Sequence, residues 1–185
     1  SNLLGSDLRI TNFGGGNTSA KVAAKDLLTG ADVMVLWVKG SGGDIGSMKL
    51  DGFSTLYMDR LESLKTLYKG LDQEDAMVHA LNHCIFDLNP RAPSIDTCLH
   101  GYVPYAHVDH VHSDAVIAIA AAKDSAKLTK EIFGKEMGYL PWQRPGIDLG
   151  FVRRGLEQLA DRQHLAPRGF ALVHLVHAQL KVFGK

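Results

Sequence analysis

The sequence predicts an α/β fold in which helices cover at least one face of a β-sheet. Apolar runs of strand length, at residues 33–38 and 170–176, alternate with segments of helical periodicity. Hydrophobic residues make up 45% and charged residues 22% of the 185 residues, proportions typical of folded soluble domains. No internal repeat or low-complexity linker divides the chain. One layered core of strands and helices is therefore expected.

The first half of the chain contains three expected elements. The run Val33–Val38 is rich in Val and Leu and predicts a buried strand. Residues 72–86 carry apolar side chains at helical spacing, with Asp72 as the expected N-cap. A second helix is expected from about Ser94 to Tyr102, because Pro104 would stop it.

The second half continues the alternation. Residues 107–112 alternate like a strand, and Ser113 or Asp114 could cap a helix through the alanine-rich segment AVIAIAAA. Three further elements complete the expected order: helices at 125–133 and 149–160, and a buried strand at 170–176.

Charge and cysteine content narrow the class of function. Lys+Arg and Asp+Glu each number 20, so no basic excess is available for nucleic acid or for a membrane surface, and a small-molecule ligand is expected. No apolar run is long enough to span a bilayer, and no secretion signal opens the chain. Cys84 and Cys98 form no CxxC motif, which indicates a reduced, cytoplasmic setting. Residues 1–185 are expected to form a single domain, as a fragment or the N-terminal part of a longer chain.

The segment HVDHVHSDA contains the strongest candidate for a metal site. His110 and His112 are two apart on an expected strand, so their side chains leave the same face and could form half of a tetrahedral zinc site. Two partly buried or surface histidines are the alternative. The flanking residues Asp109 and Asp114 could accept a hydrogen bond from a ligand N–H or could act only as caps. His107 would share the face only if the strand had a bulge.

Other histidines provide a third ligand or a rival pair. His174 and His177 lie at the end of the last expected apolar strand, where active-site groups gather in α/β sheets. His79 and His83 are four apart on an expected helix, but the residues between them, ALN, lack the glutamate of HExxH. That pair is therefore interpreted as one wall of an amphipathic helix.

Two glycine-rich loops predict anion binding. They are GGGNTSAK, at residues 14–21, and KGSGGDIG, at residues 39–46. Glycines let backbone N–H groups approach an anion, and Thr18, Ser19 and Ser41 could add hydroxyl donors. Neither loop has the spacing of a P-loop or a dinucleotide fingerprint, which disfavours ATP and NAD. Ordinary tight turns are the alternative, and the occurrence of two loops favours phosphate.

Asp96 is the candidate acid/base group. It lies in PSIDTCLH, in the first turn of an expected helix. It could cap the helix, act as a general acid/base, or bind the metal near the histidines.

Taken together, five motifs resemble the class II aldolase/adducin family. They are GGGNTSAK, WVKGSGGD, PSIDTCLH, HVDHVHSDA and ALVHLVH, which recur in the family's order between Gly14 and His177. The likeness is closest to the aldolase domain of bifunctional rhamnulose-1-phosphate aldolase/short-chain alcohol dehydrogenases. The resemblance implies a three-layer α/β/α sandwich with a central, mainly antiparallel or mixed sheet.

The resemblance also implies the residues of the site. The metal, Zn²⁺ or another divalent cation, would be held by His110, His112 and His177. Asp96 would be catalytic. Substrate and phosphate contacts would fall on Asn17, Ser19, Ser41, Gly42 and Ser94.

The implied reaction is cleavage of a ketose 1-phosphate, of the rhamnulose 1-phosphate type, into dihydroxyacetone phosphate and an aldehyde. The family's homotetramers imply a homo-oligomer. Asp96 stands where the fucose- and rhamnose-type aldolases have glutamate and the ribulose-5-phosphate 4-epimerases have aspartate, so an epimerase is one alternative. A metal-free, adducin-like interaction module is the other. The family's dehydrogenase domain has no counterpart in these residues, so hydride chemistry is not expected of them.

Overall fold

A four-stranded antiparallel sheet forms the centre of the protein. The computed structural model describes residues 1–12, 15–88, 91–134, 137–142 and 144–151. Within them the strand order is β3-β2-β1-β4, and every neighbouring pair is antiparallel. The strands are β1 (Asn17–Lys25), β2 (Asp32–Lys39), β3 (Phe53–Tyr57) and β4 (His107–His110).

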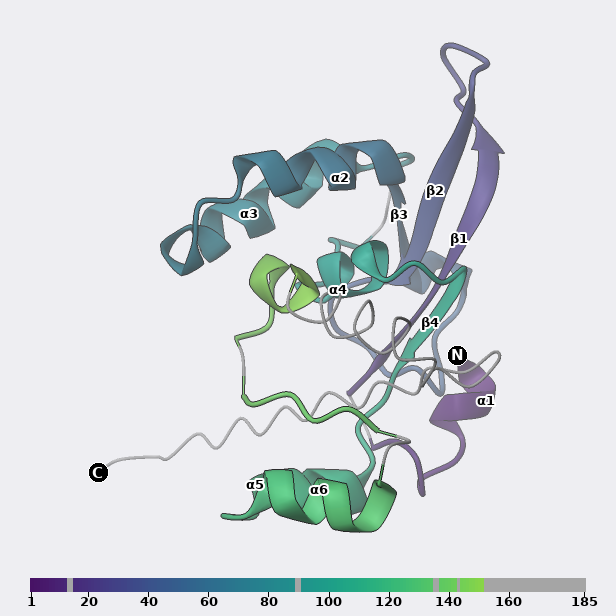
Figure 1. Ribbon diagram of the computed structural model, residues 1–185. Helices are drawn as coiled ribbons and strands as arrows, with labels where there is room; N and C mark the ends of the chain where they lie inside the picture. The colour runs from purple at the N-terminus through teal and green to yellow at the C-terminus, as the bar shows by residue number, and fades with distance from the viewer. Residues whose placement is uncertain (13–14, 89–90, 135–136, 143, 152–185) are drawn as a thin grey trace, which may run out of the picture.

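Helices pack on one side of this sheet. Figure 1 shows α2, α3 and α4 on the same side, while α5 and α6 lie together near the end of β4. The α-helices are α1 (Asn2–Gly5), α2 (Met58–Leu67), α3 (Glu74–Ala80), α4 (Thr97–Tyr102), α5 (Asp114–Ala121) and α6 (Ser125–Phe133), and the 3₁₀ turns are η1 (Leu50–Gly52), η2 (Leu71–Gln73) and η3 (Leu81–Cys84). None of the helices within the described ranges is long and apolar enough to cross a membrane.

The core lies between the sheet and the helix layer. Leu36 and Val38 project from the same face of β2 because strand side chains alternate, and both are fully buried. They meet Leu61 from α2 and Tyr102 from α4. Burying an apolar side chain of this size contributes about 1.5–3 kcal/mol, so this cluster holds α4 firmly on the sheet.

Strand register brings the first glycine loop to the candidate histidines. Asn17 pairs with His110, and Ser19 pairs with Val108. The glycines of this motif that precede β1, which end at Gly16, therefore lie next to the end of β4. Residues 93 and 89 positions apart in the sequence are neighbours here because β1 and β4 pair as antiparallel strands.

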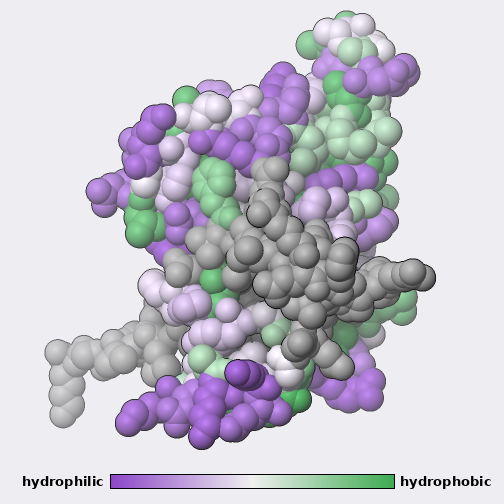
Figure 2. Space-filling view, in the orientation of Figure 1, coloured by the Kyte–Doolittle hydropathy of each residue, from purple (hydrophilic) through white to green (hydrophobic). Residues whose placement is uncertain are grey.

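The β1–β2 hairpin extends beyond the helix layer (Figure 1). Asp26 organises its turn by accepting hydrogen bonds from the backbone N–H groups of Leu28, at 3.0 Å, and Thr29, at 2.8 Å. A hydrogen bond from Tyr57, and then those from Thr29, lower the pKa of Asp26 to about 2. Leu27 and Leu28 at the tip are 94% exposed. In Figure 2 apolar residues follow the hairpin, whereas polar residues cover α2, α3 and α6.

Most of the elements expected from the sequence are confirmed. The α/β class is correct, and the expected strand at 33–38 lies within β2. Helix α6 has the expected bounds, and α4 ends at Tyr102 as Pro104 predicted. Ser113 is the N-cap of α5. The first described turn of the expected helix at 149–160 begins earlier, at residue 147. The rest of that helix, and the expected strand at 170–176, lie outside the described residues.

Two expected elements differ from the structure. The helix expected over 72–86 is divided into η2, α3 and η3, and Gln73, not Asp72, is the N-cap of α3. The helical turn stops at Cys84 because Ile85 becomes extended and forms a β-bridge with Leu56. The strand expected over 107–112 ends at His110, so His112 lies beyond its end.

Candidate active site

The two histidines of HVDHVHSDA converge although only one of them is on a strand. The Nε2 atoms of His110 and His112 are 2.9 Å apart, with ring centroids 4.7 Å apart and rings inclined by 61°. At this distance one ring donates its Nε2–H to the Nε2 lone pair of the other. His110 is 4% exposed. The expected pairing of these side chains is therefore present, but it depends on the turn after β4 and not on strand alternation.

The geometry of the pair suits a shared cation. Two nitrogens bound to one zinc ion at about 2.0–2.1 Å lie roughly 3.3 Å apart in a tetrahedral site. The two Nε2 atoms are close to that separation and face each other. Within the residues that the structure describes, no third His, Cys, Asp or Glu completes a set that could hold a metal ion. His177, the expected third ligand, lies outside the described residues, as does His174.

The first glycine loop packs directly on these histidines. A Cβ atom added to Gly15 would lie 2.8 Å from His112 Nδ1. A Cβ atom added to Gly16, which has φ +81°, would lie 2.5 Å from the His110 carbonyl oxygen. Glycine is needed at both positions because backbone and imidazole occupy the space that a side chain would fill. This loop, expected from the sequence to bind phosphate, thus packs against one side of the histidine pair.

Asp96 approaches the pair from helix α4. It is the N-cap of α4, and its Oδ2 atom is 4.0 Å from His110 Nδ1. Ser94, which is buried, donates its hydroxyl to Asp96 Oδ2 at 3.3 Å and accepts the Asp96 backbone N–H at 3.2 Å. The structure thus brings four of the expected site residues together: Ser94, Asp96, His110 and His112.

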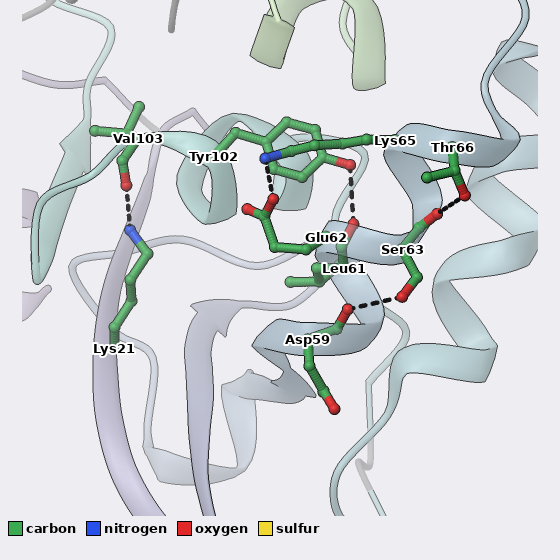
Figure 3. A network of polar contacts seen from close by, with 9 residues as sticks. All are labelled: Lys21, Asp59, Leu61, Glu62, Ser63, Lys65, Thr66, Tyr102 and Val103. Carbon is green, nitrogen blue, oxygen red and sulfur yellow. Dashed lines mark hydrogen bonds and ion pairs between the residues drawn. The ribbon is translucent and has the colours of Figure 1, made fainter.

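Helix α4 is held from both sides. The Tyr102 hydroxyl donates to the Leu61 carbonyl of α2 at 3.1 Å, and Lys21 of β1 donates to the Val103 carbonyl just after α4 (Figure 3). Lys21 also donates to the Tyr105 carbonyl at 2.7 Å. These contacts fix the helix that carries Asp96.

Asn17 and Ser19 lie on β1, beside the end of β4. The Asn17 side chain donates to the Lys39 carbonyl at 3.2 Å and so joins the start of β1 to the second glycine loop. Ser19 is 7% exposed, and its hydroxyl donates to the Val108 carbonyl at 3.3 Å and lies 2.8 Å from His100 Nδ1. Contacts of Asn17 and Ser19 with a substrate phosphate stay a prediction.

The second glycine loop borders a pocket of about 230 Å³. Gly42 and Gly43 line it and have φ values of +73° and +79°, which favour glycine. Ser41 is exposed and uses its N–H in a 2.9 Å hydrogen bond to the Ala92 carbonyl. The pocket is lined by Lys39, Gly42, Gly43, Asp44, Ser47, Met48, Lys49, Asp51, Gly52 and Arg91.

Lys39 connects this pocket with the histidine side of the site. It is 4% exposed and lines the pocket. Burial lowers the pKa of Lys39, while the charges of Asp96 and Asp44 partly oppose that shift and Arg91 adds to it. Asp96 therefore lies near enough to the pocket for its charge to act on the pKa of Lys39.

Three residues of this region were not singled out from the sequence. Lys39 and Arg91 are cations of the pocket, and His100 is the buried partner of Ser19. A lysine at the end of a buried strand, directly before a glycine loop, was the only available signal. The rival pair, His79 and His83, is exposed. Among the residues that the structure describes, neither histidine belongs to a group of three side chains that could hold a metal ion.

Comparisons with known proteins agree with this architecture. Residues 2–173 match the family described as the class II aldolase and adducin N-terminal domain. The N-terminal class II aldolase domain of a conserved protein from Thermoplasma acidophilum superposes with a TM-score of 0.77 at 30% identity, over 95% of this chain and 76% of that one.

A curated relative is considerably longer than this chain. It is YuxG of Bacillus subtilis (strain 168), named as an uncharacterized oxidoreductase, and is 44% identical over 149 residues. Those residues cover 80% of this chain and 21% of the relative, so the chain spans about a fifth of that protein's length.

Proposed function

The chain belongs to the class II aldolase and adducin N-terminal domain family. On this basis we propose that it is a metal-dependent aldolase domain. Its substrate would be a ketose 1-phosphate of the rhamnulose 1-phosphate type, which it would cleave into dihydroxyacetone phosphate and an aldehyde. One observation carries the proposal. The convergent nitrogens of His110 and His112 lie beside the Asp96 carboxylate. The charge of this carboxylate acts on the buried cation Lys39, which lines a glycine-bordered pocket.

His110 and His112 would hold the metal, Zn²⁺ or another divalent cation. His177 remains the proposed third ligand. When bound, the cation would supply Lewis-acid stabilisation of the negative charge that develops on the sugar as a carbon–carbon bond breaks. The histidines would present two ring nitrogens to the cation, His110 from a buried position beside Gly16 and His112 from a partly buried position beside Gly15.

Asp96 would transfer the proton. As the C3–C4 bond breaks, its electron pair remains on the fragment that becomes dihydroxyacetone phosphate, and the C4 hydroxyl loses its proton as C4 becomes the aldehyde carbon. Asp96 would take up that proton and deliver it to C3 of the dihydroxyacetone phosphate fragment. The hydrogen bond from Ser94 to Oδ2 fixes the direction of the carboxylate. In the synthetic direction the same oxygen would remove that proton.

The pocket at the second glycine loop would bind the phosphate. Lys39 and Arg91 supply positive charge, and the left-handed backbone at Gly42 and Gly43 leaves space for an anion. Three other expected phosphate contacts lie nearby. Asn17 donates a hydrogen bond to the Lys39 carbonyl, and Ser94 donates one to Asp96. Ser41 precedes Gly42, which lines the pocket. Anchoring the phosphate would bring the reacting bond to the histidine side of the site.

The proposal is tested by replacing one ligand. His110→Ala should lose bound zinc, measured by elemental analysis, and should lose release of triose phosphate from L-rhamnulose 1-phosphate. His79→Ala, which changes an exposed histidine outside the site, should retain both. Full activity of the His110→Ala protein would contradict the proposal.

Asp96 favours one second candidate, a 4-epimerase that acts on ribulose 5-phosphate at the same centre. Incubation with ribulose 5-phosphate would then yield its C4 epimer and release no triose phosphate.

A third candidate, the metal-free interaction module, predicts that purified protein contains no zinc and gains no activity when zinc is added. We also propose a homo-oligomeric state, a tetramer by analogy with the family, which light scattering measures.

A further inference from the structure

We infer that Ser19 and His100 are positioning residues whose buried hydrogen bond fixes Asp96 relative to His110. The inference rests on the proposed function, because it concerns the geometry of that centre. It assigns a role to a buried histidine of α4 whose ring centroid lies 6.2 Å from that of His110. Its basis is a contact between β1, β4 and α4.

The hydrogen bonds of the Ser19 hydroxyl determine the tautomer of His100. The Ser19 hydroxyl has one proton, which it donates to the Val108 carbonyl at 3.3 Å. The 2.8 Å contact with His100 Nδ1 therefore requires the ring to donate and the Ser19 oxygen to accept. His100 is held as the tautomer protonated on Nδ1, in a site where it is 0% exposed.

The same helix and the same strand pair meet again at the candidate centre. His100 is one turn after Asp96 on α4, and its N–H donates to the Asp96 carbonyl at 3.2 Å. Val108 is two residues before His110 on β4. One helical turn advances about 5.4 Å and two strand residues about 6.8 Å, so the two contacts are a short distance apart on both the helix and the strand.

The two contacts are interdependent because they join the same helix to the same pair of strands. The contacts of Tyr102 and Val103 hold the C-terminal end of α4. If the Ser19–His100 bond is lost, the part of α4 that precedes Tyr102 loses its directed contact with β1, and the 4.0 Å separation of Asp96 Oδ2 and His110 Nδ1 changes with it. An apolar contact would tolerate such a movement, whereas a directed hydrogen bond in a buried site does not. In this positioning role Ser19 and His100 act through Asp96 and His110.

The test compares matched variants. Ser19→Ala removes the bond, and Ser19→Thr keeps the hydroxyl. His100→Asn retains a donor near the place of Nδ1, whereas His100→Gln moves it toward Nε2. Thr97→Val is the control, because Thr97 Oγ1 is buried on the same helix and has no hydrogen-bond partner among the described residues.

Cobalt(II) binding is the measurement, at a temperature where circular dichroism shows each variant folded. Loss of a supporting hydrogen bond commonly weakens metal binding about 10- to 100-fold. We expect a loss of that order for Ser19→Ala and His100→Gln, with a changed visible absorption spectrum of the bound cobalt. Ser19→Thr, His100→Asn and Thr97→Val should stay within about threefold of the unmodified protein, a range well inside that loss.

The outcomes separate this inference from the proposed function. If the unmodified protein binds no cobalt, both are overturned. If it binds cobalt and folded Ser19→Ala and His100→Gln bind equally well with the same spectrum, only the positioning role is overturned. If one of these two does not fold, the other decides. If neither folds, the folded variants Ser19→Thr, His100→Asn and Thr97→Val are compared. The positioning role is supported if Ser19→Thr binds cobalt more weakly than the other two. It is overturned if all three bind cobalt equally well.

Discussion

At the scale of single residues, Gly16 is constrained twice. Its φ of +81° lies in the left-handed region, which is unfavourable for residues with a side chain. Its missing side chain also leaves room for the His110 carbonyl, which a Cβ atom would approach to 2.5 Å. The second constraint links this glycine to the histidine pair, because His110 pairs with the residue that follows it, Asn17.

Gly16→Ala should therefore impair both stability and metal binding. The left-handed backbone alone costs roughly 1–2 kcal/mol with a side chain present. The matched control is Gly30→Ala, where φ is +70° and nothing lies within 4 Å of an added Cβ atom. Both variants should lose stability in urea unfolding, but only Gly16→Ala should bind zinc more weakly in a chelator competition. Equal zinc affinities of the two variants would contradict the close packing at Gly16.

Lys39 is a residue whose burial opposes stability. Its pKa is lowered by burial, so the charged ammonium is less favourable in the folded protein than in the unfolded chain. Such a cation is retained when it binds something. The lining of the pocket and the coupling to Asp96 make a substrate phosphate the fitting partner.

Lys39→Met should accordingly stabilise the protein and weaken its function. Thermal unfolding should shift upward, because the buried charge is removed while the aliphatic stem is kept. The KM for a ketose 1-phosphate should rise by at least tenfold, since a charged hydrogen bond of about 1.5–3 kcal/mol is lost. Lys49→Met, which replaces an exposed lysine of the same pocket, should change KM less. A lower melting temperature with unchanged KM would exclude this role.

Pattern alone predicted the residues whose chemistry is visible locally. His110 and His112 are two apart, and Asp96 stands at the start of an expected helix, so each could be identified within a short window. His100 could not, because its partner Ser19 is 81 positions away and only the β1–β4 pairing brings α4 to it. Lys39 and Arg91 likewise become one pocket only after folding.

At the scale of elements, long periodic or strongly apolar segments were predictable and mixed ones were not. The strand β2 and the helix α6 were expected from their patterns. Strand β1 was not, because its sequence NTSAKVAAK is rich in Ala and Lys and becomes a strand through pairing on both edges. Helix α2 and strand β3 were also not expected. The break at Ile85 depends on its bridge to Leu56.

A buried carboxylate joins two helical elements. Glu74, at the start of α3, is 2% exposed and accepts the backbone N–H groups of Ile147 and Asp148 at 3.0 and 2.9 Å. These N–H groups begin the last described helical turn, so Glu74 satisfies two donors that a helix start leaves open. Gly146 makes this approach possible, because a Cβ atom there would lie 2.0 Å from Glu74 Oε2.

Glu74→Gln should therefore destabilise the fold. The amide keeps the shape but provides one acceptor oxygen in place of two, leaving a buried N–H without its partner at about 1–3 kcal/mol. The control is Asp75→Asn, which breaks the exposed ion pair with Arg144 and should change stability by no more than about 1 kcal/mol. Urea unfolding of both variants makes the comparison. Equal small changes would show that the helix start does not depend on Glu74.

At the scale of the whole molecule, the site depends on the sheet more than on any one segment. Strand β1 contributes contacts to β4 on one edge and to β2 on the other, so it places the histidine pair and the glycine-bordered pocket at one end of the same sheet. The sequence motifs gave the order of these parts, whereas their distances follow from strand register. Register is a property of the complete sheet, and no short window specifies it.

The two thiols predict how the stability of the whole fold responds to alkali. Burial raises the pKa of Cys84 from 9.0 to about 11 and that of Cys98 from 9.0 to about 12. Between about pH 9 and these values the native state keeps protons that the unfolded chain releases, so the free energy of unfolding must fall as pH rises. The lowered pKa of Lys39 acts in the opposite direction up to its ordinary value of 10.5.

Cys98→Val separates these contributions. In urea unfolding between pH 8.5 and 10.5, a range chosen to span the ordinary thiol pKa of about 8.5–9, this variant should lose less stability than the unmodified protein. For a fully buried thiol the difference approaches about 1.4 kcal/mol per pH unit above the unfolded pKa. Lys39→Met should steepen the same decline, because it removes the opposing contribution. Parallel curves of unfolding free energy against pH for all three proteins would contradict this prediction. They would mean that neither Cys98 nor Lys39 has a different pKa in the folded and unfolded states.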